Sequence, residues 1–258
     1  MGEKGKEMLD KTEIKYRFRR CVDSYEANAP VQKQMVERLF CLLTDYMPVV
    51  PGSILEIGCG TGLLSRFLKE RFSPAAFTVN DLVEEMCRKT VKECGMDAGS
   101  QLAGDIEEIA LERNFDLIIS SATFQWFVHP ALTLKKLAAH INSGGWLAFS
   151  TFGPENFREL RTLTDKGLFY PSTSLLEKWL GEKFDIVYRE EALHTLWFPE
   201  PLEILRHIKK TGVNGGIGTE VWTKGKMNRF CQDYFRFRTD KGFPLTYHPL
   251  YWICRKKK

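Results

Sequence analysis

Three carboxylates and three glycines in the first half of the chain have the types and spacing of a ligand-binding site. Glu56 lies in the stretch ILEIGCGTG, residues 54–62, directly before the glycines. Asp81 and Asp105 each follow a short run that reads as a strand. Because the carboxyl ends of parallel strands share one edge of a sheet, we expect the three acids to meet around the glycine turn.

A turn of this composition lets the backbone approach a ligand closely, and the acids indicate which ligand. Leu63 stands where a dinucleotide fingerprint has its third glycine, which disfavours NAD. Glu56 would repel a pyrophosphate but would suit an ammonium group. Asp81 lies about 20 residues further on, where a carboxylate can bind two ribose hydroxyls, and Asp105 is placed for an adenine amino group. The set suits S-adenosylmethionine, although each acid taken singly could equally be a loop carboxylate or a helix cap.

The elements that must position these residues alternate between short β-branched runs and helical segments, which is typical of a doubly wound, mostly parallel sheet. An amphipathic helix is predicted over residues 31–47. The predicted core then has strands at 53–57, 77–80, 101–103, 115–120 and 146–151, and helices at 63–71, 82–93 and 131–140.

The pattern changes after residue 152. Helices are predicted within 153–181 and over 201–211 and 224–238, one long or two short strands over 184–198, and a last strand at 245–254. The helices between residues 200 and 240 interrupt the last two strands. We expect them to form a lid over the carboxyl edge of the sheet, where ligands of such folds bind.

Composition limits the class of protein. With 258 residues, 43% hydrophobic and 27% charged, the chain suits one α/β domain, with an arm at 1–29, a cofactor-binding core at 30–152, and the remaining strands and lid at 153–258. No run of 18 apolar residues and no secretory signal appear, so we expect a cytoplasmic protein that is not bound to a membrane. We also expect a monomer. The seven cysteines show no CxxC pair, which predicts reduced thiols and no metal site. A net charge of +4 without a basic stripe disfavours nucleic acid.

Over residues 30–152 the chain resembles the class I S-adenosylmethionine-dependent methyltransferases. LEIGCGTG, the position of Asp81, GDIE and FDLIISSATFQW carry the resemblance. It implies a Rossmann-like, seven-stranded sheet whose last strand is antiparallel. It also implies a set of cofactor-binding residues: Glu56, Gly58, Gly60 and Gly62 around the methionine end, Asp81 and Leu82 at the ribose, Asp105 and Ile106 at the adenine, and Ser121.

Stretches outside that core resemble one subfamily, the malonyl-[acyl-carrier-protein] O-methyltransferases of biotin synthesis. They are FRRCVDSYEANAPVQKQM, SATFQW, LAFSTFGPENFREL, LWFPEPLEILRHIKKTGVNG and PLTYHPLYWI, with Phe18, Tyr25, Ala29 and Gln32 at matching places. This resemblance implies methyl transfer to the free carboxylate of a malonyl group on acyl-carrier protein, an acidic partner. Since a fold does not set chemistry, the substrate assignment rests on these outer stretches.

The implied reaction needs no general base, because a carboxylate with an ordinary pKa of about 4 is already ionised at neutral pH. Catalysis would then rest on alignment and the exclusion of water. Phe124, Trp126 and Tyr25 are candidate walls around the sulfonium, where a cation–π contact would help, and Gln125 is assigned to the same substrate pocket. Ordinary core packing is the alternative for the aromatic residues.

The acceptor carboxylate needs a cation or donor, and the lid helix offers Arg206. Its guanidinium fork binds two oxygens in a fixed geometry, so Arg206 is the predicted clamp, with Tyr247 and His248 as secondary candidates. Lys209 and Lys210 are expected to face the carrier. A solvated helix face is the alternative for Arg206. Two other functions stay open: a methyltransferase for another small acid, and a non-catalytic binding protein. An RNA methyltransferase is disfavoured by the lack of an NPPY-like motif.

Overall fold

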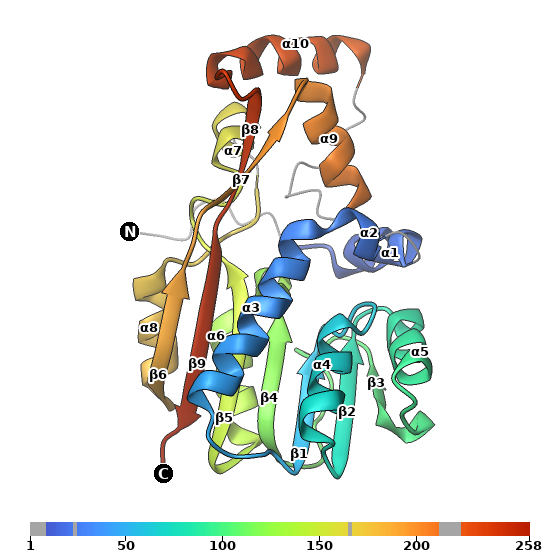
Figure 1. The fold of residues 1–258 in the computed structure, drawn as a ribbon, viewed down its shortest axis with the longest axis vertical. Coiled ribbons are helices and arrows are strands. Elements are labelled where there is room, and N and C mark those ends of the chain that lie inside the picture. Colours follow the sequence, from blue (N-terminus) through green and yellow to red (C-terminus); the bar gives the residue numbers. More distant parts are fainter. Residues whose placement is uncertain (1–8, 23–24, 165–166, 212–222) are drawn as a thin grey trace.

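A seven-stranded sheet forms the centre of the molecule (Figure 1). The computed structural model describes residues 9–22, 25–164, 167–211 and 223–258. In spatial order the strands are β3 (Gln101–Ala103), β2 (Ala76–Asp81), β1 (Ser53–Ile57), β4 (Phe115–Ser121), β5 (Ile141–Phe152), β9 (Pro249–Lys256) and β6 (Phe184–Glu191). β9 runs antiparallel to both of its neighbours, whereas β1 to β5 pair in parallel. The predicted fold class, with its antiparallel last strand, is confirmed.

Helices cover both faces of this sheet. Helices α3 (Pro30–Tyr46), α4 (Leu63–Phe72) and α5 (Glu84–Glu93) share one core cluster, and α6 (Pro130–Ala139) and α8 (Thr173–Gly181) share the other. Helix α3 begins at a proline, whose fixed φ suits the first helical position. Its apolar residues recur at three- and four-residue intervals, so one stripe faces the sheet.

The lid contains a β-ribbon as well as helices. β7 (His194–Phe198) and β8 (Phe243–Tyr247) pair antiparallel in a separate sheet, which lies beyond the carboxyl ends of β1 and β4 together with α7 (Arg158–Thr164), α9 (Pro201–Lys210) and α10 (Lys224–Tyr234) (Figure 1). The single last strand predicted over 245–254 is therefore wrong. The segment is divided at His248 into β8 and β9, which pair in two different sheets. The alternation of apolar and polar residues in the sequence does not reveal this change of partner strand.

Two helices precede α3 that the sequence pattern did not predict. Helix α1 (Lys11–Cys21) begins after Asp10, whose side chain accepts the N–H groups of Thr12 and Glu13. Helix α2 (Tyr25–Asn28) follows, and both lie across the carboxyl ends of the strands (Figure 1). Short 3₁₀ turns occur at Ala98–Ser100, Phe124–Trp126 and Phe235–Phe237. Within the described ranges, no helix is both long and apolar enough to cross a membrane.

Candidate active site

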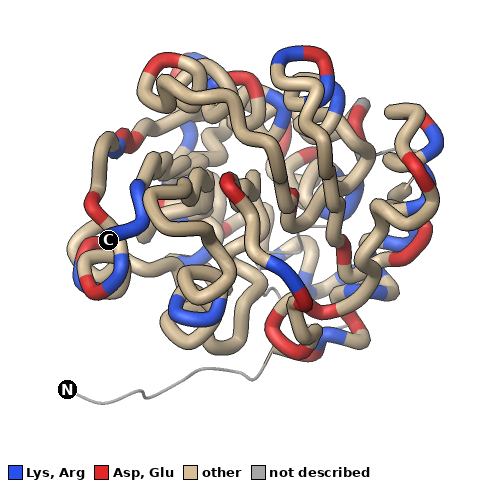
Figure 2. Tube along the Cα trace, turned by 90° about the horizontal axis from the view of Figure 1, so that it is seen from below, with Lys and Arg blue, Asp and Glu red and all other residues tan. Residues whose placement is uncertain are grey.

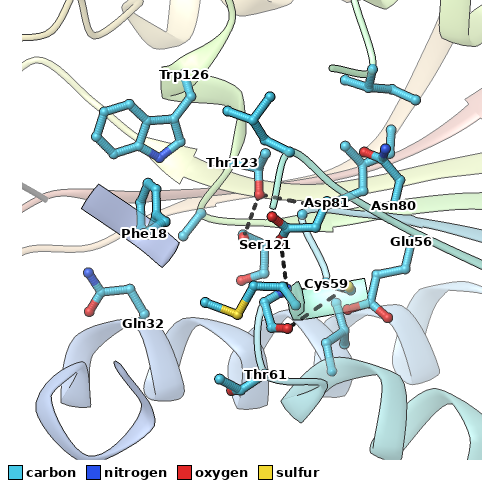
Figure 3. Close-up of a pocket in the computed structure, with 18 of the residues that line it drawn as sticks. Phe18, Gln32, Glu56, Cys59, Thr61, Asn80, Asp81, Ser121, Thr123 and Trp126 are labelled. Atoms are coloured by element: carbon cyan, nitrogen blue, oxygen red, sulfur yellow. Dashed lines mark hydrogen bonds between the residues drawn. The ribbon is translucent and has the colours of Figure 1, made fainter. Parts of the chain in front are cut away.

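A cavity opens at the carboxyl ends of β1, β2 and β4, between the strand ends and helices α1 to α3 (Figure 3). It brings together most of the predicted cofactor residues. Those that line it are Glu56, Gly58, Gly60, Asp81, Leu82, Asp105, Ile106 and Ser121, with Trp126 from the predicted substrate pocket. Strand ends and a glycine turn thus meet as parallel-sheet topology requires.

The glycines of the turn have different tasks. Gly58 and Gly60 have φ values of +70° and +53°, a left-handed conformation that suits glycine. A Cβ on Gly58 would lie 2.0 Å from Oγ1 of Thr123, whereas a Cβ on Gly60 would meet none of the described residues within 4 Å. Gly62 is the N-cap of α4 and does not line the cavity; its Cβ would lie 3.0 Å from Oγ1 of Thr90 on α5. Gly62 therefore allows α4 and α5 to approach, and Gly60 leaves space for a ligand.

Asp81 joins the end of β2 to the glycine turn. Its Oδ2 accepts the N–H of Gly60 at 3.0 Å, and its Oδ1 accepts the N–H of Val83 at 2.8 Å. Burial raises the pKa of Asp81 to about 6, although these two hydrogen bonds favour the charged form. The carboxylate is both a local loop acceptor and part of the cavity wall (Figure 3).

Glu56 is the most buried of the three acids, with 1% of its surface exposed. Oγ of Ser65 donates a hydrogen bond to its Oε2 at 2.5 Å. Burial is the main reason that the pKa of Glu56 is raised to about 8, and the nearby Asp81 carboxylate raises it further. Without a cation beside it, this carboxyl holds its proton at neutral pH, whereas a bound ammonium would favour the ionised form.

Asp105 forms an ion pair with the N-terminal helix α1. Nζ of Lys11 lies 3.0 Å from a carboxylate oxygen of Asp105 and 2.8 Å from one of Glu107. Burial acts to raise the pKa of Glu107, but hydrogen bonds from Lys11, Val128 and His129 lower it overall. Sequence reasoning missed Lys11 because it did not predict α1. Lys11 also lines the cavity and so closes it beside the predicted adenine position.

Aromatic rings line one side of the cavity. Trp126 meets Phe18 of α1 edge-on, with ring centroids 5.4 Å apart (Figure 3). Phe124 instead stacks on Phe149 in the core at 4.2 Å and does not line the cavity. Gln125 does not line it either; its amide donates to the carbonyl of Ala122 at 2.6 Å and accepts from Thr151. Phe124 and Gln125 therefore have packing and hydrogen-bonding roles outside the cavity, whereas Trp126 and Phe18 line it. The role of Trp126 beside the sulfonium stays a prediction.

Tyr25 is the third aromatic candidate. Its backbone begins α2, but its side chain lies outside the part of the chain that the structure describes. Its role next to the sulfonium stays a prediction.

The three lid candidates lie outside this cavity. Arg206 is exposed on α9. Tyr247 is buried, and its hydroxyl lies 2.8 Å from Nε2 of His207, whose pKa burial lowers. Nδ1 of His248 accepts the N–H of Glu155 at 3.1 Å. Tyr247 thus joins β8 to α9 within the lid, and His248 contacts the segment that follows β5. The role of all three candidates as substrate ligands stays a prediction.

Helix α2 links the lid to the glycine turn. Oε2 of Glu26 accepts from Oγ1 of Thr61 at 3.2 Å, and Oε1 accepts from Nη2 of Arg66 at 2.9 Å. Arg66 also donates to the Thr61 carbonyl, so the turn is held from two sides. The same helix contacts α9 of the lid.

Among the described residues, no group of three or more His, Cys, Asp or Glu side chains is placed to hold a metal ion.

Comparisons with known proteins agree with this geometry. A family model described as a methyltransferase domain matches residues 16–198. The chain is 38% identical to the malonyl-[acyl-carrier protein] O-methyltransferase of Bacteroides thetaiotaomicron, over 97% of this chain and 100% of the relative. It is also 38% identical to the enzyme of that name from Calditerrivibrio nitroreducens, over 95% and 96%. A Bacteroides fragilis relative of the same name is 40% identical over 95% of this chain, which spans 50% of that relative's length.

Solved structures show the same fold at low sequence identity. A structure from Bacillus halodurans (BH2331) has a TM-score of 0.61 and 15% identity, covering 86% of this chain and 100% of its own. The N-methyltransferase NodS from Bradyrhizobium japonicum, in complex with S-adenosyl-L-homocysteine, has a TM-score of 0.58 and 13% identity, covering 95% and 100%. Fold, glycine turn and family model together define a methyltransferase. Within that class, the chain belongs to the malonyl-[acyl-carrier protein] O-methyltransferase family.

Proposed function

We propose that this protein transfers a methyl group from S-adenosylmethionine to the free carboxylate of a malonyl group held on acyl-carrier protein. One observation carries the proposal above all: similarity to the named relatives extends over 95–97% of the chain and so includes the lid. The methyltransferase family model ends at residue 198, before α9 begins. The later part of the lid, α9, α10 and β8, thus lies outside the general methyltransferase model but inside the similarity to the named relatives.

The residues of the cavity fit S-adenosylmethionine. Glu56 would face the ammonium, Asp81 the ribose hydroxyls, and Asp105 with Ile106 the adenine. Trp126 would lie near the sulfonium, where its ring face favours a cation. When bound, S-adenosylmethionine supplies an electrophilic methyl group, and the residues of this chain hold and orient it.

The acceptor explains why the cavity needs no general base. A malonyl half-thioester has one free carboxylate, which is ionised well below neutral pH. Holding it in line with the methyl can contribute roughly 7–11 kcal/mol through proximity alone. Opposite charges disappear during transfer, so Trp126, Phe18 and the buried strand ends also assist by excluding water.

Charge on the lid supports an acidic protein partner. Residues 201–247 contain nine Lys and Arg and four Asp and Glu, a net charge of +5, which exceeds the +4 of the whole chain. Arg206, Lys209 and Lys210 are exposed on α9. Viewed from below, Lys and Arg are instead interspersed with Asp and Glu (Figure 2). A basic lid over the cavity would steer an acidic carrier and place its malonyl arm at the opening.

The experiment compares three acceptors: malonyl-acyl-carrier protein, malonyl-coenzyme A and free malonate. We expect the highest kcat/KM for the carrier protein, falling as ionic strength rises because the steering is electrostatic. Lys209→Glu with Lys210→Glu should lower this value and its salt dependence. Lys257→Glu with Lys258→Glu, at the end of the molecule far from the lid, changes the net charge by the same amount and is the matched control (Figure 1). Equal efficiency with free malonate, or no transfer to any of the three, contradicts the proposal.

A further inference from the structure

Gln32 is a buried side chain whose polar atoms have no hydrogen-bond partner among the residues that the structure describes. Only 5% of its surface is exposed, and within the described part of the chain both its Oε1 and its Nε2 are enclosed without a hydrogen bond. Buried polar groups are almost always paired, because an unpaired one keeps the full loss of its hydration. Of the described residues with such orphaned side-chain atoms, Gln32 is the one that lines the cavity (Figure 3).

The helix that carries Gln32 presents further donors at the same place. Helix α3 has 17 residues and starts at Pro30, and its N-cap residue, Ala29, forms no side-chain cap. The first intrahelical bond of α3 runs from the N–H of Lys33 to the carbonyl of Ala29, so the N–H groups of Val31 and Gln32 precede it. The first turn holds no acidic side chain, and Ala29, Gln32 and Lys33 all line the cavity.

The cavity therefore has an acidic side and a donor side. Glu56, Asp81 and Asp105 stand at the strand ends, whereas the first turn of α3 offers an amide, a helix N-terminus and Lys33. A helix N-terminus with an aligned donor favours an anion, and a planar carboxylate matches the single donor group of an amide.

We propose that the Gln32 amide, supported by the first turn of α3, binds a carboxylate inside the cavity. Two carboxylates could reach this site: that of the methionine part of the cofactor, and that of the malonyl acceptor. The identity of the second one rests on the proposed function. Gln32 differs from Arg206 in lying within the cavity wall, where a bound carboxylate would accept a hydrogen bond from its Nε2.

Two variants test the site. Gln32→Met keeps the approximate volume and removes both polar atoms, and Gln32→Glu keeps the shape and places a negative charge where a carboxylate would bind. Without ligand, Gln32→Met should unfold at the same temperature as wild type or higher, because it removes an unsatisfied group. Calorimetry then measures the affinity of each protein for S-adenosylhomocysteine and for 5′-methylthioadenosine, a nucleoside that lacks the amino-acid part.

The two sources give different results. If Gln32 binds the cofactor's carboxylate, Gln32→Met should weaken S-adenosylhomocysteine at least tenfold and leave 5′-methylthioadenosine unchanged, with Gln32→Glu weaker still. If it binds the acceptor, both nucleosides should bind as in wild type while KM for malonyl-acyl-carrier protein rises at least tenfold.

The proposed function and the Gln32 site can fail separately. Selective loss of S-adenosylhomocysteine affinity supports the site even if wild type does not methylate the malonyl carrier. Unchanged S-adenosylhomocysteine affinity overturns the site when KM is also unchanged or when wild type shows no turnover. Equal weakening of both nucleosides, or a lower unfolding temperature for Gln32→Met, also overturns it, since either result indicates a structural role.

Discussion

Replacing Glu56 by Gln should remove a pH dependence from the stability of the protein. Burial raises the pKa of Glu56 to about 8, whereas the ordinary value is 4.5. The folded protein therefore binds this proton more tightly than the unfolded chain does. Its stabilising effect is complete below the ordinary pKa and is lost as pH rises towards 8. Asp81 acts in the same direction over a lower range, because its pKa is about 6.

The difference between the two pKa values of Glu56 sets the size of the effect. At about 1.4 kcal/mol for each pKa unit, the ceiling is about 5 kcal/mol. Between pH 6.5 and 8 the expected loss from Glu56 is about 1.5 kcal/mol, while Asp81 contributes only about 0.2 kcal/mol because it is already mostly ionised. That window therefore isolates Glu56.

Urea unfolding at pH 6.5 and pH 8, without ligand, measures this difference. Glu56→Gln keeps an oxygen to accept the Ser65 hydrogen bond, so its fold should survive. Its free energy of unfolding should fall by about 1.5 kcal/mol less than that of wild type over the window. An equal fall in the two proteins would refute the reasoning, because Glu56 would then not hold the buried proton.

Other substitutions and conditions test separate parts of the site. Asp81→Ala should weaken S-adenosylmethionine by about 1.5–3 kcal/mol, the range for hydrogen bonds to a charged group, and unchanged calorimetric affinity in a folded variant would remove Asp81 from the site. Gly60→Ala should mainly weaken cofactor binding, whereas Gly62→Ala, with its Cβ against Thr90, should mainly lower the melting temperature; the reverse pattern would contradict their assigned tasks. The rate should stay level from pH 8 down to pH 6, since the acceptor is already ionised, and a tenfold rise per pH unit over that range would indicate a hydroxyl or amine acceptor. Arg206→Ala should raise KM for the malonyl carrier more than tenfold without changing cofactor affinity if Arg206 is the clamp, and wild-type kinetics would leave the clamp to another residue.

The core of this fold was predictable because its signals are local. The parallel strands β1, β2, β4 and β5 each contain a short apolar run. Asp81 at the end of β2 and Asp105 shortly after β3 mark the carboxyl edge. Glu56 could be placed because the glycine turn comes directly after it. Parallel topology then brings these residues to one edge without any further information.

The remainder depends on tertiary contacts that leave no local pattern. The strand on either side of His248 changes sheets, although its apolar character is continuous. Phe124 and Trp126 share one short 3₁₀ turn, yet the first packs in the core and the second lines the cavity. Lys11 lies more than 90 residues from Asp105 in sequence, and only the path of α1 brings them together. Gln32 appeared on an amphipathic helix, where nothing in the sequence indicates that its amide lacks a partner.

The position of the transferred methyl group tests the central claim most directly. Wild-type protein is incubated with malonyl-acyl-carrier protein and S-adenosylmethionine carrying a ¹³C-labelled methyl group, and the product is analysed by NMR and by mass spectrometry of the released acyl chain. The proposed function predicts the label on oxygen, as the methyl ester of the malonyl carboxylate, with the thioester intact. Label on carbon, sulfur or a carrier side chain, or an acyl chain without label, would contradict it.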